Sequence, residues 1–245
     1  MKLLRNATIA LATLTAATTA SAEYLYGFGN VSINRLDWTN KTEKNTAHKD
    51  FTYLEAEGGA GFTWGEVYGF FDLENPHKSS KDGRRLATKA NTRINLGETG
   101  FNLFAQVYDL RTHDFDEQNR FVGFGYNFTG DNYFFKPTLS LHHAETTYFK
   151  GNNGYMLGWV AGYNFKAMGE DFMITNWHEY EFGRNSNYLR SASGNSKKSG
   201  HNGGLALWWN ATDSITAGLQ YRYADDKLGN ATYQDGIIYS LKYNF

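Results

Sequence analysis

The feature of this sequence that most constrains its fold is a two-residue alternation that recurs along most of the chain. The stretch FTYLEAEGGAGFTWGEVYGFFDLEN, residues 51–75, shows it clearly. Successive side chains of an extended strand point to opposite faces. One face would carry Phe51, Tyr53, Glu55, Glu57, Gly59 and Gly61, and the other Leu54, Ala56, Ala60, Phe62 and Trp64. The apolar face would lie against a protein core or against lipid, and the alternation alone leaves both open.

Twelve segments alternate in this way, and the connections between them are short and long in turn. The segments are approximately 24–36, 50–64, 67–74, 85–97, 100–110, 119–128, 132–144, 154–165, 171–182, 201–209, 214–224 and 233–245. The long connections centre on 37–49, 75–84, 111–118, 145–153, 183–200 and 225–232. Outer-membrane barrels have short turns at one rim and long loops at the other. We therefore expect an all-β, antiparallel transmembrane barrel of about 12 strands, with both termini periplasmic.

Most of these segments keep one face free of charge, as contact with lipid requires. A lysine or arginine on the lipid face costs about 2–4 kcal/mol at the bilayer midplane. Segment 171–182 is the exception, and there we expect Glu179 and Glu181 to point inward and His178 to lie near a rim. A soluble barrel of the lipocalin type remains the alternative, although such a barrel does not need a bare apolar exterior.

The N-terminus and the composition agree with an exported protein. Residues 1–22 have two basic residues, an apolar run and an Ala-Ser-Ala end, which is typical of a secretory signal peptide. Residues 23–245 are expected to form one barrel domain, with no stretch near the roughly 18 apolar residues of a membrane helix. The chain has no cysteine, which excludes disulfides and thiolate metal sites. Its 24 basic and 25 acidic residues show no bias toward nucleic acid.

If the apolar faces look outward, the other faces line the interior with charged, polar and aromatic side chains. Twelve strands lie between the filled eight-stranded barrels and the wide porins, which predicts a narrow lumen. Flat aromatic faces beside polar groups suit a ring-bearing solute, although the same charges could simply plug the barrel with salt bridges. The candidate solute-binding residues of the lumen are Tyr53, Glu55, Glu57, Tyr68, Phe70, Asp72, Lys89, Arg93, Phe104, Glu179 and Arg222.

The first short connection predicts how two of these strands pair. A two-residue turn at Gly65-Glu66 would set Gly59 opposite Asp72. Glu57 would then be a diagonal neighbour of Asp72, and two close carboxylates are unfavourable unless a cation balances them. We expect the cations to come from the next strand, as Lys89 and Arg93.

Several segments carry a family resemblance. They are TYLEAE at 52–57, VYGFFD at 67–72, FFKPTLSLHH at 134–143, NWHEYEFGR at 176–184 and the closing YNF, within a C-terminal YSLKYNF that resembles the closing-strand signal of Gram-negative outer-membrane proteins. Together they resemble the nucleoside-specific channel-forming proteins of the Tsx family, which includes OmpK-like proteins. The resemblance implies a monomeric channel in the outer-membrane lipid that passes nucleosides and deoxynucleosides without a cofactor. It also implies a lumen role for Tyr53, Glu55, Glu57, Tyr68 and Asp72.

Other functions remain as alternatives. A less selective small-solute porin would share the barrel, and so would a surface receptor for phage or colicin, a role that the family resemblance also implies. An outer-membrane hydrolase is more remote, because the HHA sequence at 142–144 lacks the serine of a barrel phospholipase. His113, Asp114 and Asp116 could serve a protease at the rim. The alternating Asp114, Asp116 and Gln118 fall short of a calcium loop, so we expect no metal site.

Overall fold

The computed structural model describes residues 22–191 and 196–245, and the predicted signal peptide lies almost wholly outside this part of the chain. The described strands are β1 (Tyr24–Trp38), β2 (Phe51–Phe62), β3 (Gly65–Glu74), β4 (Arg85–Asn95), β5 (Phe101–Arg111), β6 (Asp116–Tyr126), β7 (Phe128–Thr129), β8 (Tyr133–Thr146), β9 (Lys150–Ala167), β10 (Glu170–Phe182), β11 (Ser199–Asn210), β12 (Ile215–Asp225) and β13 (Gln234–Asn244). Two short helices, α2 (Asn40–Asn45) and α3 (Ser186–Ser191), lie in long connections.

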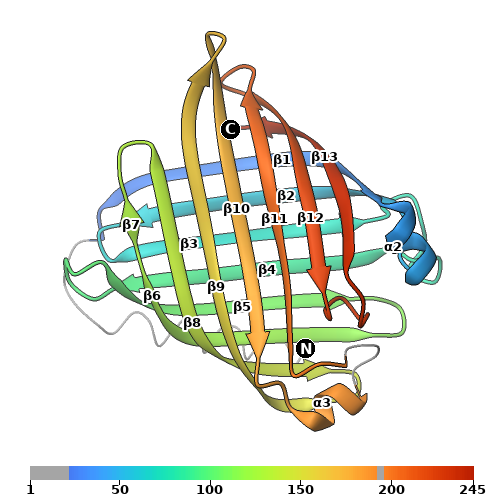
Figure 1. Ribbon diagram of the computed structural model, residues 1–245. Helices are drawn as coiled ribbons and strands as arrows, with labels where there is room; N and C mark the ends of the chain where they lie inside the picture. Colours follow the sequence, from blue (N-terminus) through green and yellow to red (C-terminus); the bar gives the residue numbers. More distant parts are fainter. Residues whose placement is uncertain (1–21, 192–195) are drawn as a thin grey trace.

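Twelve of these strands close into one antiparallel barrel, as predicted, and the two-residue β7 extends it beside β8. Apart from β7, which pairs with β8 alone, each strand pairs with its neighbours in the sequence, and β6 pairs with β8. The last strand returns to the first, with nine residues of β1 paired to β13 from Asn30↔Asn244 to Trp38↔Gly236. Figure 1 shows β8–β13 as a front wall that crosses the wall of β1–β5 behind it.

The outer surface of the barrel is apolar. Val122 is 63% exposed and Phe124 is 61% exposed on β6, and leucines of the neighbouring β8 lie beside them. Monomeric soluble proteins rarely expose a continuous apolar surface of this extent. The belt continues round the barrel through Ile33, Leu54, Leu103, Leu157, Leu205, Leu219 and Leu241. No described helix is long and apolar enough to cross a membrane.

Two of the predicted long connections are shorter in the structure. β6 already begins at Asp116, while β8 continues to Thr146 and β9 begins at Lys150. Ion pairs between neighbouring strands hold these ends together, with Arg111 contacting Asp116 at 2.9 Å and Lys150 contacting Glu145 at 2.9 Å. These charges point outward above the apolar belt, so the strands extend past it. The residues proposed for a rim protease or a calcium loop are therefore partly strand residues.

The turn between β2 and β3 lies earlier than predicted. Phe62 pairs with Gly65, so the turn residues are Thr63 and Trp64, and the predicted turn at the next two residues is wrong. Gly65 instead begins β3 with a φ of 148°, and a Cβ atom there would lie 1.9 Å from the carbonyl oxygen of Arg93. Glycine is required at this position because β4 approaches so closely.

The register of β2 and β3 changes with the turn. Gly59 lies opposite Tyr68, and Asp72 lies opposite Glu55 instead of Gly59. The shift is an even number of residues, so every side chain keeps its predicted face. Glu57 also remains a diagonal neighbour of Asp72, as expected, because it pairs with Phe70.

Strand β10 carries polar side chains on both of its faces. Glu179 and Glu181 point inward, as predicted, since their polar contacts lie inside the barrel. His178 points outward and lies four residues before the end of β10 at Phe182. Its Nδ1 atom lies 2.8 Å from the hydroxyl of Tyr223, and its ring stacks on Trp159 at 4.4 Å. These contacts give the imidazole a hydrogen-bond partner and a stacking partner, so no charged side chain is placed on the apolar belt here.

Candidate functional site

The barrel interior is filled unevenly. On the wall of β5, β6, β8 and β9, Phe104, Phe121 and Met156 form a buried cluster, with exposures of 4%, 2% and 1%. Polar neighbours on the same wall, Asn102 and His142, are also buried. This half of the interior is packed like a protein core, so Phe104 contributes packing rather than a free aromatic face.

The opposite half carries charged and partly exposed side chains of β2, β3 and β13. Its centre is Glu57, which accepts a 2.7 Å hydrogen bond from the hydroxyl of Tyr68. Lys242 lies 2.9 Å from the other carboxylate oxygen of Glu57. Phe70 contacts Tyr68 edge to face at 6.5 Å, and both rings are only partly buried. Aromatic faces and a paired carboxylate therefore lie next to each other on this wall.

The cations predicted to balance the acidic wall have other partners. Closure of the barrel brings β13 within two strands of β2, so Lys242 is the cation beside Glu57. Arg93 lies opposite Glu66 in the register, and its Nε atom is 3.2 Å from that carboxylate. Glu66 also pairs with Lys136 of β8. The expectation that Lys89 and Arg93 balance Glu57 and Asp72 was therefore wrong.

Glu55 and Asp72 form an acidic pair without a matched cation. They are directly opposite each other on β2 and β3, where side chains are about 4.5–5.5 Å apart at Cβ. Ser32 donates a 3.4 Å hydrogen bond to Glu55. No lysine or arginine of the described chain forms an ion pair with either carboxylate, and Oδ1 of Asp72 is buried without a hydrogen-bond partner. Tyr53 lies next along β2 on the same face.

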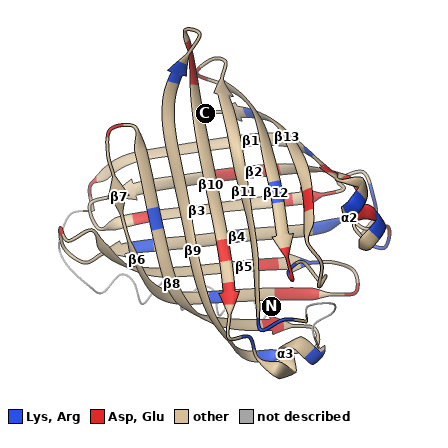
Figure 2. Ribbon diagram, in the orientation of Figure 1, with Lys and Arg blue, Asp and Glu red and all other residues tan. Residues whose placement is uncertain are grey.

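An ion pair spans the interior at the boundary between the packed half and the charged half. Nζ of Lys89 on β4 lies 2.8 Å from Oε1 of Glu179 on β10. The amides of Gln106 and Asn202 each donate a 3.2 Å hydrogen bond to the same carboxylate. Figure 1 shows β10 in the front wall and β4 in the wall behind, and Figure 2 shows charges of both signs on the two walls.

Arg222 lies beside this crossing. Its guanidinium stacks at 4.8 Å on the ring of Trp177, over which the Lys89 ammonium also lies, at 5.7 Å. Arg222 donates to the side chain of Asn202 at 2.8 Å. The predicted site residues therefore fall into three groups. Lys89, Glu179 and Arg222 join at the crossing, and the residues of β2 and β3 share one wall. Arg93 and Phe104 contact each other at 4.9 Å in the packed half.

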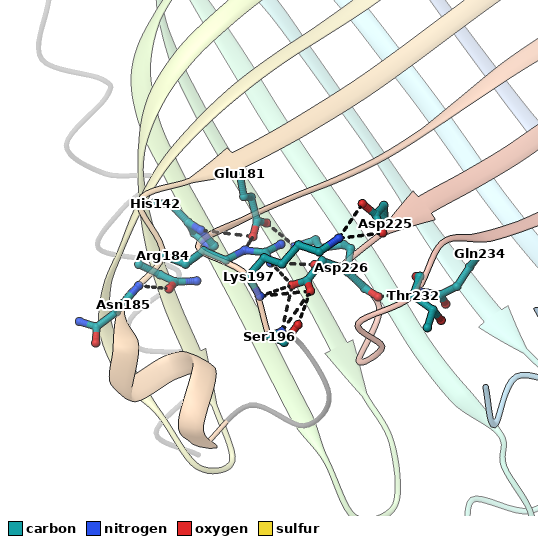
Figure 3. Close-up of polar contacts among 12 residues, drawn as sticks. His142, Glu181, Arg184, Asn185, Ser196, Lys197, Asp225, Asp226, Thr232 and Gln234 are labelled. Atoms are coloured by element: carbon teal, nitrogen blue, oxygen red, sulfur yellow. Dashed lines mark hydrogen bonds and ion pairs between the residues drawn. The ribbon is translucent and has the colours of Figure 1, made fainter. Parts of the chain in front are cut away.

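A buried ionic network closes part of the end that carries the long connections (Figure 3). Arg184, which is 0% exposed, lies 3.1 Å from Glu181 and 3.0 Å from Asp226. Asp226 also accepts hydrogen bonds from the backbone of Ser196 and Lys197. The network, Glu181, Arg184, Ser196, Lys197 and Asp226, ties the β10–β11 connection to the β12–β13 connection. Sequence reasoning placed Glu181 inside but missed Arg184, whose three-residue spacing from Glu181 was the available signal.

The other end of the barrel is open to a polar cavity of about 820 Å³. Residues of the β9–β10 and β11–β12 turns line it, together with Asn132 and Asn244. Among the described residues, no group of three or more histidines and carboxylates is placed to hold a metal ion. Among the described residues, the interior therefore offers hydrogen-bond donors, hydrogen-bond acceptors and aromatic rings to a bound molecule.

Comparison with known families gives one match that covers most of the chain. A family model described as the nucleoside-specific channel-forming protein Tsx matches residues 33–245. The match begins inside β1 and includes every strand after it.

Comparison with solved structures supports the fold. The NanC porin aligns with a TM-score of 0.56 at 10% sequence identity, covering 87% of this chain and 98% of that chain. A KdgM porin, solved in complex with disordered oligogalacturonate, aligns with a TM-score of 0.51 at 10% identity, covering 88% of this chain and 99% of that chain. At this identity the similarity concerns the barrel architecture alone.

Proposed function

The chain belongs to the nucleoside-specific channel-forming Tsx family of the Gram-negative outer membrane, and on that premise we propose how its lumen passes nucleosides. The solute moves down its gradient along the wall formed by β2 and β3. A channel site must bind weakly enough to release its solute, so a few hydrogen bonds and one stacking contact suit the task better than a closed pocket.

The observation that supports this assignment is the combination of aromatic faces and unbalanced carboxylates on one wall. A nucleoside offers a flat base for stacking and ribose hydroxyls as hydrogen-bond donors. Tyr68 and Phe70 would receive the base, while Glu55 and Asp72, which lack a cation, would accept from the hydroxyls. The proposed solute-contacting set is Tyr53, Glu55, Glu57, Tyr68, Phe70, Asp72 and Arg222.

The other predicted residues would act as framework. Phe104 and Arg93 are each 4% exposed, and their side chains contact each other at 4.9 Å. They support the filled half of the interior and have little surface to offer a solute. We further propose that the barrel works as a monomer without a catalytic step. Its short turns would face the periplasm, because that arrangement is usual for outer-membrane barrels.

Uptake into proteoliposomes tests the proposal. Tyr68→Ala and Asp72→Asn should each lower the rate of labelled nucleoside uptake, while the fraction of folded barrel stays the same. Lys150→Met, on the outer wall above the apolar belt, serves as the matched control and should leave uptake unchanged. Equal uptake of nucleosides and hexoses by the native protein, with no effect of the lumen variants, would instead support a less selective porin.

A further inference from the structure

We propose that the Lys89–Glu179 ion pair is a partition that sets the cross-section and the charge selectivity of the lumen, rather than a contact for the solute. The proposal rests on the proposed channel function. It assigns to these two residues a role different from that of the β2–β3 wall.

The position of the two strands makes the pair a crossing. Going round the barrel from β4 to β10, four strands lie between them on one side, namely β5, β6, β8 and β9, and six on the other. The 2.8 Å contact between Lys89 and Glu179 therefore joins opposite walls. By contrast, Glu57 and Lys242 lie on strands separated only by β1, so that pair stays along one wall.

The two sides of the crossing differ in what fills them. The side with four strands holds the buried cluster of Phe104, Phe121 and Met156. The other side holds the partly exposed Glu55 and Tyr68. That side also holds a smaller buried cluster of Leu36, Trp38 and Ile238 on β1 and β13. The pair thus separates the Phe104 cluster from the charged wall of β2 and β3, and the path for a solute lies off the barrel axis, between the pair and the β2–β3 wall.

Hydrogen bonds hold the partition in place from both walls. Gln106 of β5 and Asn202 of β11 both donate to Glu179, and Asn202 in turn accepts from Arg222. Both side chains of the pair are 17% exposed. A paired carboxylate and ammonium present little net charge to passing ions, whereas removal of one partner leaves the other uncompensated.

Single-channel recording in planar bilayers separates the effects of size and charge. Lys89→Ala combined with Glu179→Ala removes the crossing without leaving a net charge, and we expect the ion conductance to rise by at least about twofold. Lys89→Met leaves Glu179 unpaired and should shift the reversal potential in a salt gradient toward cation selectivity. Glu179→Gln leaves Lys89 unpaired and should shift the reversal potential toward anion selectivity.

Two controls keep the test decisive. Lys150→Ala combined with Glu145→Ala removes an ion pair of the outer wall and should not change conductance or selectivity. The exchanged pair, Lys89→Glu with Glu179→Lys, restores a crossing of opposite polarity and should keep the native conductance. If the alanine pair does not fold, the exchanged pair takes its place as the double variant of the test.

The outcomes distinguish this proposal from the channel function itself. An unchanged conductance in the alanine pair would overturn the partition, and so would single variants that shift selectivity in the same direction. A native barrel that conducts ions but not nucleosides would overturn the proposed solute and leave the partition standing. A native barrel without conductance, together with a conducting alanine pair, would support the partition and contradict the channel function.

Discussion

The hydroxyl of Tyr68 donates a 2.7 Å hydrogen bond to Oε1 of Glu57, which Lys242 balances from the opposite oxygen. The tyrosine is thus held against the wall of the lumen by its polar end, and the residue as a whole is only partly buried. Phe28 at 6.3 Å and Phe70 at 6.5 Å flank the ring. The geometry separates the ring, which can stack on a base, from the hydroxyl, which fixes its position.

Substitution of Tyr68 should therefore distinguish stacking from hydrogen bonding. Tyr68→Ala should weaken nucleoside binding about tenfold, because stacking of a base on an aromatic side chain contributes about 1–3 kcal/mol. Tyr68→Phe keeps the ring and should lose much less affinity for the nucleoside. Competition by unlabelled nucleoside in the uptake assay gives both affinities, with Tyr163→Ala on the outer wall as the control. Equal losses in the two Tyr68 variants would contradict a stacking role.

The buried ionic network predicts a large loss of stability at Arg184. Arg184→Met leaves the Asp226 carboxylate buried without its cation, and breaking such a pair costs about 3–5 kcal/mol. Unfolding of the refolded barrel by guanidinium should show this loss. The exposed Lys150–Glu145 pair provides the comparison, since Lys150→Met should cost no more than about 1 kcal/mol. Similar midpoints for the two variants would show that the network does not stabilise the barrel.

Two glycines with left-handed backbone should respond differently to alanine. At Gly97 the φ is 64° and an added Cβ meets no atom within 4 Å, so Gly97→Ala should cost only the conformational strain, about 1–2 kcal/mol. Gly65→Ala places its Cβ 1.9 Å from a backbone oxygen of β4 and should prevent normal pairing of β3 with β4. Yields of heat-modifiable folded barrel on cold gels measure the difference. Equal yields of folded barrel for the two variants would contradict the steric conflict expected at Gly65.

The connection between β1 and β2 should loosen in acid through His48. Burial lowers the pKa of His48, Arg85 and Arg222 add to that effect, and a hydrogen bond with Gln234 opposes it. The unfolded chain, with a histidine pKa of about 6.5, then binds more protons than the folded one. The stabilising contribution of His48 is therefore complete above about pH 6.5 and falls as the pH drops below it.

Hydrogen exchange of residues 39–50 should be slow at pH 7.5 and faster at pH 5, after correction for the intrinsic rate. The stacking of His48 on Trp38 at 4.8 Å is the contact expected to weaken. His48→Gln has no titrating group and should remove the extra pH dependence. If that variant shows the same acid response as the native protein, another group is responsible.

The orientation of nearly every strand residue could be predicted from sequence, because lipid on one side and polar side chains on the other impose a period of two. That is why Glu179 and Glu181 were correctly turned inward despite an ambiguous segment. The ends of the strands were less predictable. Charged residues such as Asp116 and Glu145 suggested loops, whereas the strands extend past the apolar belt, where Asp116 pairs with Arg111 and Glu145 pairs with Arg120.

The partners of interior side chains could not be predicted to the same degree. Neighbours in sequence suggested Lys89 for Glu57, but barrel closure brings Lys242 nearer and lets Lys89 reach across to Glu179. Such contacts depend on the curvature of the whole sheet, which no local pattern encodes. The same limit hid the contacts of Arg184, whose partner Asp226 is 42 residues away.

The central claim, that the β2–β3 wall of this barrel binds nucleosides weakly during passage, is tested most directly by ion current through the native protein in a planar bilayer. Added nucleoside should reduce the current in a saturable manner, and an equal concentration of hexose should not. The reduction should require a much higher nucleoside concentration in Tyr68→Ala. Identical effects of nucleoside and hexose, or a nucleoside block that is unchanged in Tyr68→Ala, would contradict the claim.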